Sequence, residues 1–220
     1  MTYITGDTHG EPSRFSTKNF QGTKDDIIIV AGDFGFIWTG DKKDDYWLDA
    51  LAQKLFTICF VDGNHENFNA LANYPIVPWN GGLTHKIREN IFHLMRGEIF
   101  SIDGNSIFVM GGGTSIDKSH RKENISWWSQ EEPNFAEIEN GFEHLEAVGN
   151  SVDYVIAHEL PQEIMRQFDG DWETYGHTRK ILDEFNNIIQ FKKWYCGHYH
   201  INTDIGKYSI LYDRIVALGE

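Results

Sequence analysis

The chain has 220 residues, of which 40% are hydrophobic and 14% aromatic, and its formal net charge is −14. This composition supports a buried core and excludes a disordered chain, and the length fits one α/β domain over residues 1–220. The negative charge argues against binding long nucleic acids, because contacts with their phosphates need clustered lysine and arginine side chains. It still permits a phosphorylated substrate if bound divalent cations reverse the charge locally.

The N-terminus lacks the basic and then apolar profile of a signal peptide, and no segment approaches the roughly 18 consecutive apolar residues of a membrane span. We therefore expect a cytoplasmic protein without a membrane segment. The two cysteines, Cys59 and Cys196, lie in apolar and aromatic surroundings. We expect both to be buried, reduced thiols.

The first third of the chain repeats one pattern: an apolar strand, a turn with glycine and polar residues, and then a helix. Strands are predicted at 3–5, 26–31 and 56–61, a short helix at 13–20, and a longer helix at 43–54, where apolar residues recur at helical spacing. The near-continuous apolar run at 26–31 is typical of a strand covered on both faces. This alternation predicts an α/β fold with parallel strands and helices packed on them.

The middle of the chain changes to short strand-like runs at 83–87, 91–94, 98–102 and 106–110. The last two are joined by Asp103-Gly104-Asn105, which is a hairpin signal. Beyond them we predict a helix at 131–148, a strand at 152–157, a loop at 168–176, a helix at 177–189 and a strand at 193–196. The tail at 201–216 is predicted to form an antiparallel hairpin, and no repeat or linker divides the chain.

Polar residues follow five of the predicted strands. They are Asp7 and His9, then Asp33, then Asn64 with His65, then His158, and finally His198 with His200. Ligands of α/β proteins gather at the carboxyl ends of the strands, so we expect these side chains to meet. Imidazoles combined with carboxylates suit Mn, Fe or Zn better than Ca. The set exceeds what one ion needs, and two ions about 3.5–4 Å apart would use it fully.

The order of these blocks resembles the calcineurin-like metallophosphoesterase family. The matching segments are Gly6-Asp7-Thr8-His9-Gly10, Gly32-Asp33, Gly63-Asn64-His65-Glu66, His158 and Gly197-His198-Tyr199-His200. Each block alone is a weak signal, but their ordered conjunction from residue 6 to residue 200 is specific. The resemblance implies a four-layer α-β-β-α sandwich with mixed sheets, and a hydrolase of phosphate mono- or diesters.

The resemblance also implies a role for each matched residue. The expected metal ligands are Asp7, His9 and His200 for one divalent ion, Asn64, His158 and His198 for the other, and Asp33 as the bridge between them. A hydroxide between the ions would attack phosphorus. His65 would bind no metal, and would instead protonate the leaving oxygen.

The chain departs from the protein-phosphatase branch of the family. In that branch the bridging aspartate is followed by a further aspartate and arginine, which orient the catalytic histidine and hold phosphate. The corresponding positions here are Phe36 and Ile37. This departure weakens assignment as a Ser/Thr phosphoprotein phosphatase and favours a phosphorylated small molecule or nucleotide as the substrate.

Other residues are candidates for the missing functions. Arg121 or Arg88 could hold phosphate, Asp62 or Glu66 could orient His65, and Trp38 could line a substrate pocket. The histidines outside the blocks are expected to be structural, and Gly111-Gly112-Gly113 is expected to allow tight packing beside the metal edge. Two further hypotheses remain open: a nuclease of the same fold, which the acidic charge disfavours, and a non-catalytic metal-binding scaffold, which would have no need of His65.

Overall fold

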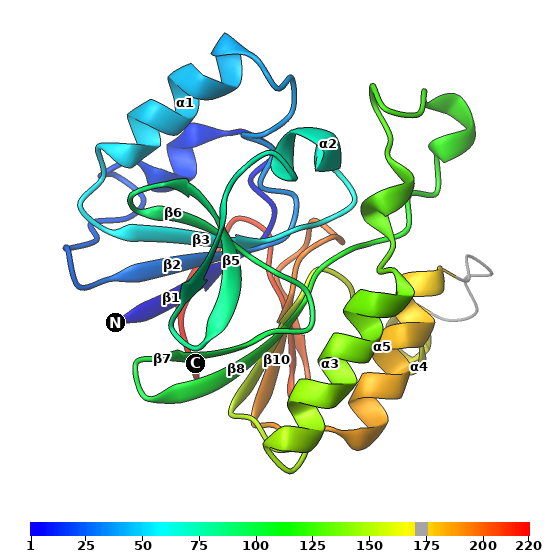
Figure 1. Cartoon of the computed structure of the whole chain (residues 1–220). Helices are drawn as coiled ribbons and strands as arrows, with labels where there is room; N and C mark the ends of the chain where they lie inside the picture. Colours follow the sequence, from blue (N-terminus) through cyan, green and yellow to red (C-terminus); the bar gives the residue numbers. More distant parts are fainter. Residues whose placement is uncertain (170–175) are drawn as a thin grey trace.

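The computed structural model describes residues 1–169 and 176–220, so residues 170–175 of the predicted loop lie outside the described part. Two β-sheets face each other in the middle of the molecule, and helices cover their outer faces (Figure 1). The predicted four-layer α-β-β-α sandwich with mixed sheets is confirmed.

The first sheet contains the strands that precede three of the polar turns. In spatial order its strands are β13 (Ile215–Ala217), β1 (Thr2–Thr5), β2 (Ile27–Ala31), β3 (Thr57–Val61), β6 (Ile91–Leu94), β5 (Gly82–Arg88) and β4 (Ile76–Trp79). The central strands β1, β2, β3 and β6 are parallel. The outer strands β13, β5 and β4 each run antiparallel to their inner neighbour.

The second sheet contributes the other two polar turns. Its strands are β11 (Thr203–Ile205), β12 (Tyr208–Ile210), β10 (Lys193–Cys196), β9 (Tyr154–Ala157), β8 (Asn105–Met110) and β7 (Ile99–Ile102). The strands β12, β10, β9 and β8 are parallel, and β7 and β11 close the edges in antiparallel pairs. The predicted hairpin around Asp103-Gly104-Asn105 is the β7–β8 turn.

Helices cover the outer faces of both sheets (Figure 1). The first sheet carries α1 (Lys42–Ala52), η1 (Pro12–Phe15) and the single turn α2 (Phe68–Leu71), while the second carries α3 (Phe135–Ala147), α4 (Gln162–Asp169) and α5 (His177–Ile188). The short turns η2 (Lys118–His120) and η3 (Ser129–Glu131) lie in the segment before α3. Asp41 caps α1, and Asn134 with Glu137 forms a capping box on α3.

The core has three parts because successive residues of a strand point to opposite faces. In β2, Ile29 and Ala31 pack between the sheets, whereas Ile28 and Val30 pack under α1. A third cluster joins the outer face of the second sheet to α3, α4 and α5, and includes Phe185. Burial on both faces explains the continuous apolar runs, and it also buries Cys59 and Cys196, which are free thiols as predicted.

Some elements differ from the prediction. The tail forms the β11–β12 hairpin, but β13 leaves it and pairs with β1 in the other sheet, where Val216 joins the core between the sheets. The helix predicted from residue 131 begins at Phe135, because Asn134 provides the cap. β4 was not predicted; it contains Pro78, which is tolerated because β4 is an edge strand.

No helix in the described ranges is both long and apolar enough to cross a bilayer.

Candidate metal centre

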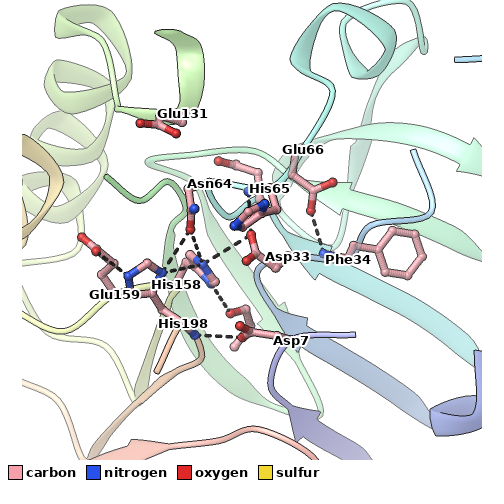
Figure 2. Close-up of polar contacts among 12 residues, drawn as sticks. Asp7, Asp33, Phe34, Asn64, His65, Glu66, Glu131, His158, Glu159 and His198 are labelled. Atoms are coloured by element: carbon pink, nitrogen blue, oxygen red, sulfur yellow. Dashed lines mark hydrogen bonds and ion pairs between the residues drawn. The ribbon is translucent and has the colours of Figure 1, made fainter. Parts of the chain in front are cut away.

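Polar side chains from five turns meet at one edge of the molecule, where strands of both sheets end (Figure 2). These turns follow β1, β2, β3, β9 and β10, and they bring together Asp7, His9, Asp33, Asn64, His65, His158, His198 and His200. Residues separated by up to 193 positions therefore lie within a few ångströms of one another, and the expected metal ligands fall into two groups.

The first group contains Asp7, His9 and His200. The Nε2 atoms of His9 and His200 are 2.9 Å apart, and His200 Nε2 lies 3.0 Å from Asp7 Oδ2. Asp7 Oδ2 is buried and accepts no hydrogen bond of good geometry. Both histidines are partly exposed, so this group lies at the open side of the site.

The second group contains Asn64, His158 and His198, and it is more deeply placed. Asn64 Oδ1 lies 3.1 Å from both His158 Nε2 and His198 Nδ1, and these two nitrogens are 3.2 Å apart. Three donor atoms thus form a nearly equilateral triangle (Figure 2).

Asp33 lies between the two groups. Its Oδ1 is 3.4 Å from His158 Nε2, and its Oδ2 is 3.7 Å from His9 Nε2. The side chain is almost completely buried. One carboxylate therefore faces both groups.

The ligand-bearing turns adopt an unusual backbone conformation. Asp33, His9, His198 and His200 all have positive φ angles, between 45° and 68°. This region costs non-glycine residues free energy, on the order of 1–3 kcal/mol each, and such residues occur in tight turns and cluster at functional sites. Hydrogen bonds from the amides of Thr8 and His9 to the carbonyl of Asp33 hold two of these turns together.

Two glycines are required by close approach of these side chains. A Cβ atom on Gly32, whose φ is +94°, would lie 1.9 Å from His158 Nδ1. A Cβ atom on Gly63 would lie 2.1 Å from Asp33 Oδ1. The glycine before Asp33 and the glycine before Asn64 thus make room for the opposing ligand.

The buried carboxylates of Asp7 and Asp33 need a nearby positive charge to stay ionised. Burial by itself would lower the pKa of His158, but the carboxylates of Asp33 and Asp7 outweigh it and raise that pKa to about 10. Burial would likewise raise the pKa of Asp33, yet the charge of His158 brings it down to about 2. A divalent cation could supply the same charge and leave the imidazole neutral.

Further side chains, which the sequence did not indicate, orient the second group. The amide nitrogen of Asn64 donates to Ser115 Oγ at 3.0 Å, and Ser115 Oγ donates to Glu131 at 2.6 Å. His158 Nδ1 lies 2.9 Å from the carbonyl of Ala31, so its proton belongs there and Nε2 points into the site.

Glu159 holds the remaining ligand of that group. Its Oε1 lies 3.1 Å from His198 Nε2 and also accepts a hydrogen bond from Arg179 at 3.2 Å. A proton on Nε2 leaves His198 Nδ1 free to bind a metal ion. The position of Glu159 directly after His158 was the one available sequence signal for this contact.

A family model, that of the calcineurin-like phosphoesterases, matches residues 2–202. The chain belongs to the calcineurin-like phosphoesterase family. The description of the family is that of phosphoesterases. Comparison with curated proteins gives no significant match.

Two solved structures are similar to this phosphoesterase at low identity. One is a candidate 5′-nucleotidase from Staphylococcus aureus in complex with α-ketoglutarate, with 16% identity, a TM-score of 0.47, and coverage of 96% of this chain and 48% of the other. The second is the Thermus thermophilus sulfate thiohydrolase SoxB in complex with glycerol, with 14% identity, a TM-score of 0.41, and coverage of 86% and 33%. The phosphoesterase chain spans about half the length of the first protein and a third of the second.

His65 lies beside the two groups of candidate metal ligands and belongs to neither. Its backbone amide donates to Asp33 Oδ1 at 2.8 Å, and its ring contacts the guanidinium of Arg121, with Nη1 3.0 Å from Nδ1 and Nη2 3.3 Å from Nε2. Burial lowers the pKa of His65, and Arg121 adds to that effect against the opposing charge of Asp33. Asp117 fixes Arg121 through an ion pair of 2.8 Å.

The other candidates fall in different places. Trp38 lies next to His65, with 6.3 Å between ring centroids. Arg88 is away from the centre and pairs with Asp45 and Asp49 of α1. The candidates for orienting His65 have other partners: Asp62 binds His93 and Arg96, and Glu66 accepts a hydrogen bond from the amide of Phe34. The hypotheses that Arg88 holds phosphate and that Asp62 or Glu66 orients His65 are therefore wrong.

The glycine run packs tightly, as predicted. A Cβ atom on Gly111 would lie 2.4 Å from Asp62 Oδ1, and one on Gly113 would lie 3.2 Å from Asn64 Oδ1. The amides of Gly112 and Gly113 donate to the carbonyls of Asp62 and Glu131.

Proposed function

We propose that this phosphoesterase hydrolyses phosphate mono- or diesters with two divalent cations. The residues that would hold them are Asp7, His9 and His200 for one cation, Asn64, His158 and His198 for the other, and Asp33 for both. The position of Asp33 carries the proposal, because its two oxygens face different donor groups, at 3.4 Å from His158 and 3.7 Å from His9. A carboxylate in this position is suited to bridge two cations.

The donor atoms fit ions such as Mn, Fe or Zn. Metal–nitrogen bonds are about 2.0–2.1 Å long, so ligand atoms around one such ion lie roughly 3 Å apart. The nitrogens of His9 and His200 are separated by 2.9 Å, and those of His158 and His198 by 3.2 Å. Asp7 Oδ2 is buried and accepts no hydrogen bond of good geometry although His200 Nε2 lies 3.0 Å away, so this oxygen is available to a cation. Imidazole and carboxylate ligands together favour these metals over Ca.

When bound, the cations would polarise the phosphate oxygens and acidify a nearby water. The protein's own groups complete the site. Asp33 accepts a hydrogen bond from the backbone amide of His65, and this bond fixes the position of His65 relative to the two groups of candidate ligands. A phosphate anion bound beside Arg121 would raise the pKa of His65 again, and His65 would then give a proton to the leaving oxygen. Arg121, held by Asp117, would bind a phosphate oxygen with its guanidinium.

A small phosphorylated molecule or a nucleotide fits this site better than a phosphoprotein. Phe36 and Ile37, at the positions of the protein-phosphatase aspartate and arginine, are each 2% exposed and pack in the core under α1. They therefore contribute no phosphate contact. The cavities beside His65 have volumes of about 280 and 290 Å³, which suits groups of small-molecule size.

Removal and replacement of metal tests the proposal. The protein is treated with a chelator, dialysed, and reloaded with Mn, and turnover of bis-p-nitrophenyl phosphate and p-nitrophenyl phosphate is measured alongside the bound metal per chain. We expect activity to vanish with the metal and to return with close to two Mn per chain. Asp33→Asn should lower both the stoichiometry and the activity. Absence of metal-dependent turnover of either ester would contradict the proposed function.

A further inference from the structure

Two cavities open beside His65. The first, which we call the aromatic cavity, is lined by His9, His65, Trp38 and Trp47 among others, and has a volume of about 280 Å³. The second, the arginine cavity, is lined by Asn64, His65, His198, Arg121, Arg179 and Tyr199 among others, and has a volume of about 290 Å³. His65 is the residue that the two linings share.

Each cavity also borders a different metal-binding group. His9, which lines the aromatic cavity, belongs to the group on the open side of the site. Asn64 and His198, which line the arginine cavity, belong to the deeper group. A phosphate at the metal centre would therefore have a separate space on each side, and each space is of a size for one substituent.

The segment that carries Trp38 in the aromatic cavity is held in place by Asp44. The buried carboxylate of Asp44 accepts hydrogen bonds from the amides of Trp38 and Gly40, at 2.8 and 2.7 Å, and from the hydroxyl of Thr39 at 2.8 Å. These hydrogen bonds fix the backbone that carries Trp38, and they satisfy the carboxylate oxygens of Asp44. Trp128 packs edge-on against Trp38 at 5.3 Å and supports the indole.

The second wall comes from α1, where Trp47 is half-buried on the same helix as Asp44. Indole rings bind flat aromatic groups by stacking, at a cost in conformational entropy that is small when the rings are already fixed. The exposed Lys43 lines the same cavity and adds a positive charge.

The arginine cavity has a different chemistry. Arg121 is fixed by Asp117, and Arg179, which is buried, is fixed by Glu159 and lies over the ring of Tyr199 at 5.7 Å. Thr114 and Ser115 add hydroxyl groups to the lining. This space suits a polar or anionic substituent, because two guanidinium groups and two hydroxyl groups line it.

We propose that the substrate is a phosphodiester with two different substituents. One is a nucleoside, whose base lies in the aromatic cavity, and the other lies in the arginine cavity. This inference rests on the proposed function. Hydrolysis adds the oxygen of one water to phosphorus and breaks one phosphorus–oxygen ester bond. The products are a phosphomonoester and an alcohol, and no redox partner takes part. A monoester would leave one of the two cavities without a substituent.

Binding measurements with the Mn-loaded protein test the aromatic cavity without relying on turnover. Adenosine 5′-monophosphate and ribose 5-phosphate are titrated calorimetrically into the wild type, Trp38→Ala, Trp38→Phe and Trp47→Ala. We expect the nucleotide to bind about 5- to 150-fold more tightly than the sugar phosphate, the factor given by stacking of one base. Trp38→Ala and Trp47→Ala should remove most of that ratio, and Trp38→Phe should retain much of it.

Phe135→Ala is the matched control, since Phe135 is an aromatic residue of α3 that is 77% exposed and lines neither cavity. It should leave the ratio unchanged. Thermal melting of each variant shows whether the protein is folded. If Trp38→Ala does not fold, the comparison of Trp38→Phe with Trp47→Ala still decides the test. Equal affinity of the wild type for nucleotide and sugar phosphate would overturn the proposal.

The second arm compares kcat/KM for bis-p-nitrophenyl phosphate and p-nitrophenyl phosphate, which share a leaving group. The diester should be preferred by at least about tenfold, because only the diester fills both cavities. Metal-dependent turnover without this preference would overturn the diester assignment and leave the proposed function standing. No turnover of either ester under any metal load would instead contradict the proposed function itself.

Discussion

The position of each metal-binding side chain depends on a few neighbouring atoms that the sequence does not reveal. The sequence indicated the candidate ligands, because aspartate, asparagine and histidine follow strands in an order that resembles the family, and the structure brings these side chains together. Ser115, Glu131 and Arg179 could not, because their contacts with Asn64 and Glu159 join segments that are distant in the chain. Their residue types are common on any protein surface, so only the folded structure shows that they contact the site.

Glu159→Gln should weaken metal binding, because a neutral amide holds the Nε2 proton of His198 less strongly than a carboxylate. Losses of roughly 10- to 100-fold in metal affinity are usual when such a supporting contact is removed. Mn titration by calorimetry or competition measures the change. Glu146→Gln, at an exposed position of α3, is the control. Unchanged affinity in Glu159→Gln would show that His198 needs no such support.

His65→Ala should depress kcat, and by an amount that depends on the leaving group. Loss of a proton donor typically costs about 10²- to 10⁴-fold. The loss should be large for phenyl or alkyl esters, whose leaving oxygens need a proton, and small for p-nitrophenyl esters, whose leaving group is stable as an anion. Steady-state assays across a series of leaving groups provide the comparison. An equal loss across the series would argue against proton donation by His65.

At the scale of elements, the strands that lead into the site were the most predictable, because burial on both faces produces continuous apolar runs. The pairing of strands with their neighbours was harder to predict. β13 lies beside β1, with Tyr3 opposite Ala217, and nothing local in either segment selects that partner. The single-turn helix α2 and the edge strand β4 are short, and their stability comes from packing rather than from their own sequence pattern.

Gly32→Ala should disrupt the β2 turn far more than a positive φ alone would explain. The added methyl group would overlap His158 Nδ1, whose position is fixed by Ala31. Gly206→Ala is the matched control, since Gly206 also has positive φ but no atom within 4 Å of the added carbon, so it should cost only about 1–2 kcal/mol. Chemical denaturation and metal titration compare the two. Equal effects would mean that the turn can shift without loss.

The loop between β6 and β7 is joined to the metal-binding turn by a buried ion pair. Arg96 donates to Asp62 Oδ2 at 2.8 and 2.5 Å and to Glu137 of α3 at 3.0 Å, and its side chain is 4% exposed. Arg96→Met would leave the buried carboxylate of Asp62 with His93 but without its arginine, and loss of a buried charge partner typically costs about 3–5 kcal/mol of folding free energy.

Arg88→Met provides the comparison for that substitution. Arg88 pairs with Asp45 and Asp49, whose side chains are mostly exposed, and exposed pairs contribute about 0–1 kcal/mol. Denaturant unfolding of both variants measures the difference. A cost for Arg96→Met as small as that of Arg88→Met would show that the turn relaxes around Asp62.

At the scale of the whole molecule, the candidate metal centre joins turns from both sheets. Asp7, Asp33 and Asn64 follow strands of the first sheet, and His158 and His198 follow strands of the second. The four-layer arrangement followed from the family resemblance rather than from periodicity, because apolar runs show that a strand is buried without showing which layer covers it.

Bound metal should therefore raise the stability of the complete fold. At a concentration 100 times the dissociation constant, one bound ion adds about 2.7 kcal/mol to the free energy of unfolding, which for a chain of this size raises Tm by roughly 5–10 °C. Calorimetry with excess Mn and with EDTA measures the shift, and Asp33→Asn should reduce it. An identical Tm under both conditions would contradict metal binding by the folded state.

The ligands span the chain from Asp7 to His200, and their turns become neighbours only when both sheets have formed. A nascent chain that has left the ribosome as far as Asn64 carries Asp7, His9 and Asp33 as well, but has yet to receive His158, His198 and His200. Translation at about 5–20 residues per second makes this interval last many seconds. With the proposed ligand set, cation capture follows synthesis, and the ion supply where folding is completed decides which metal is bound.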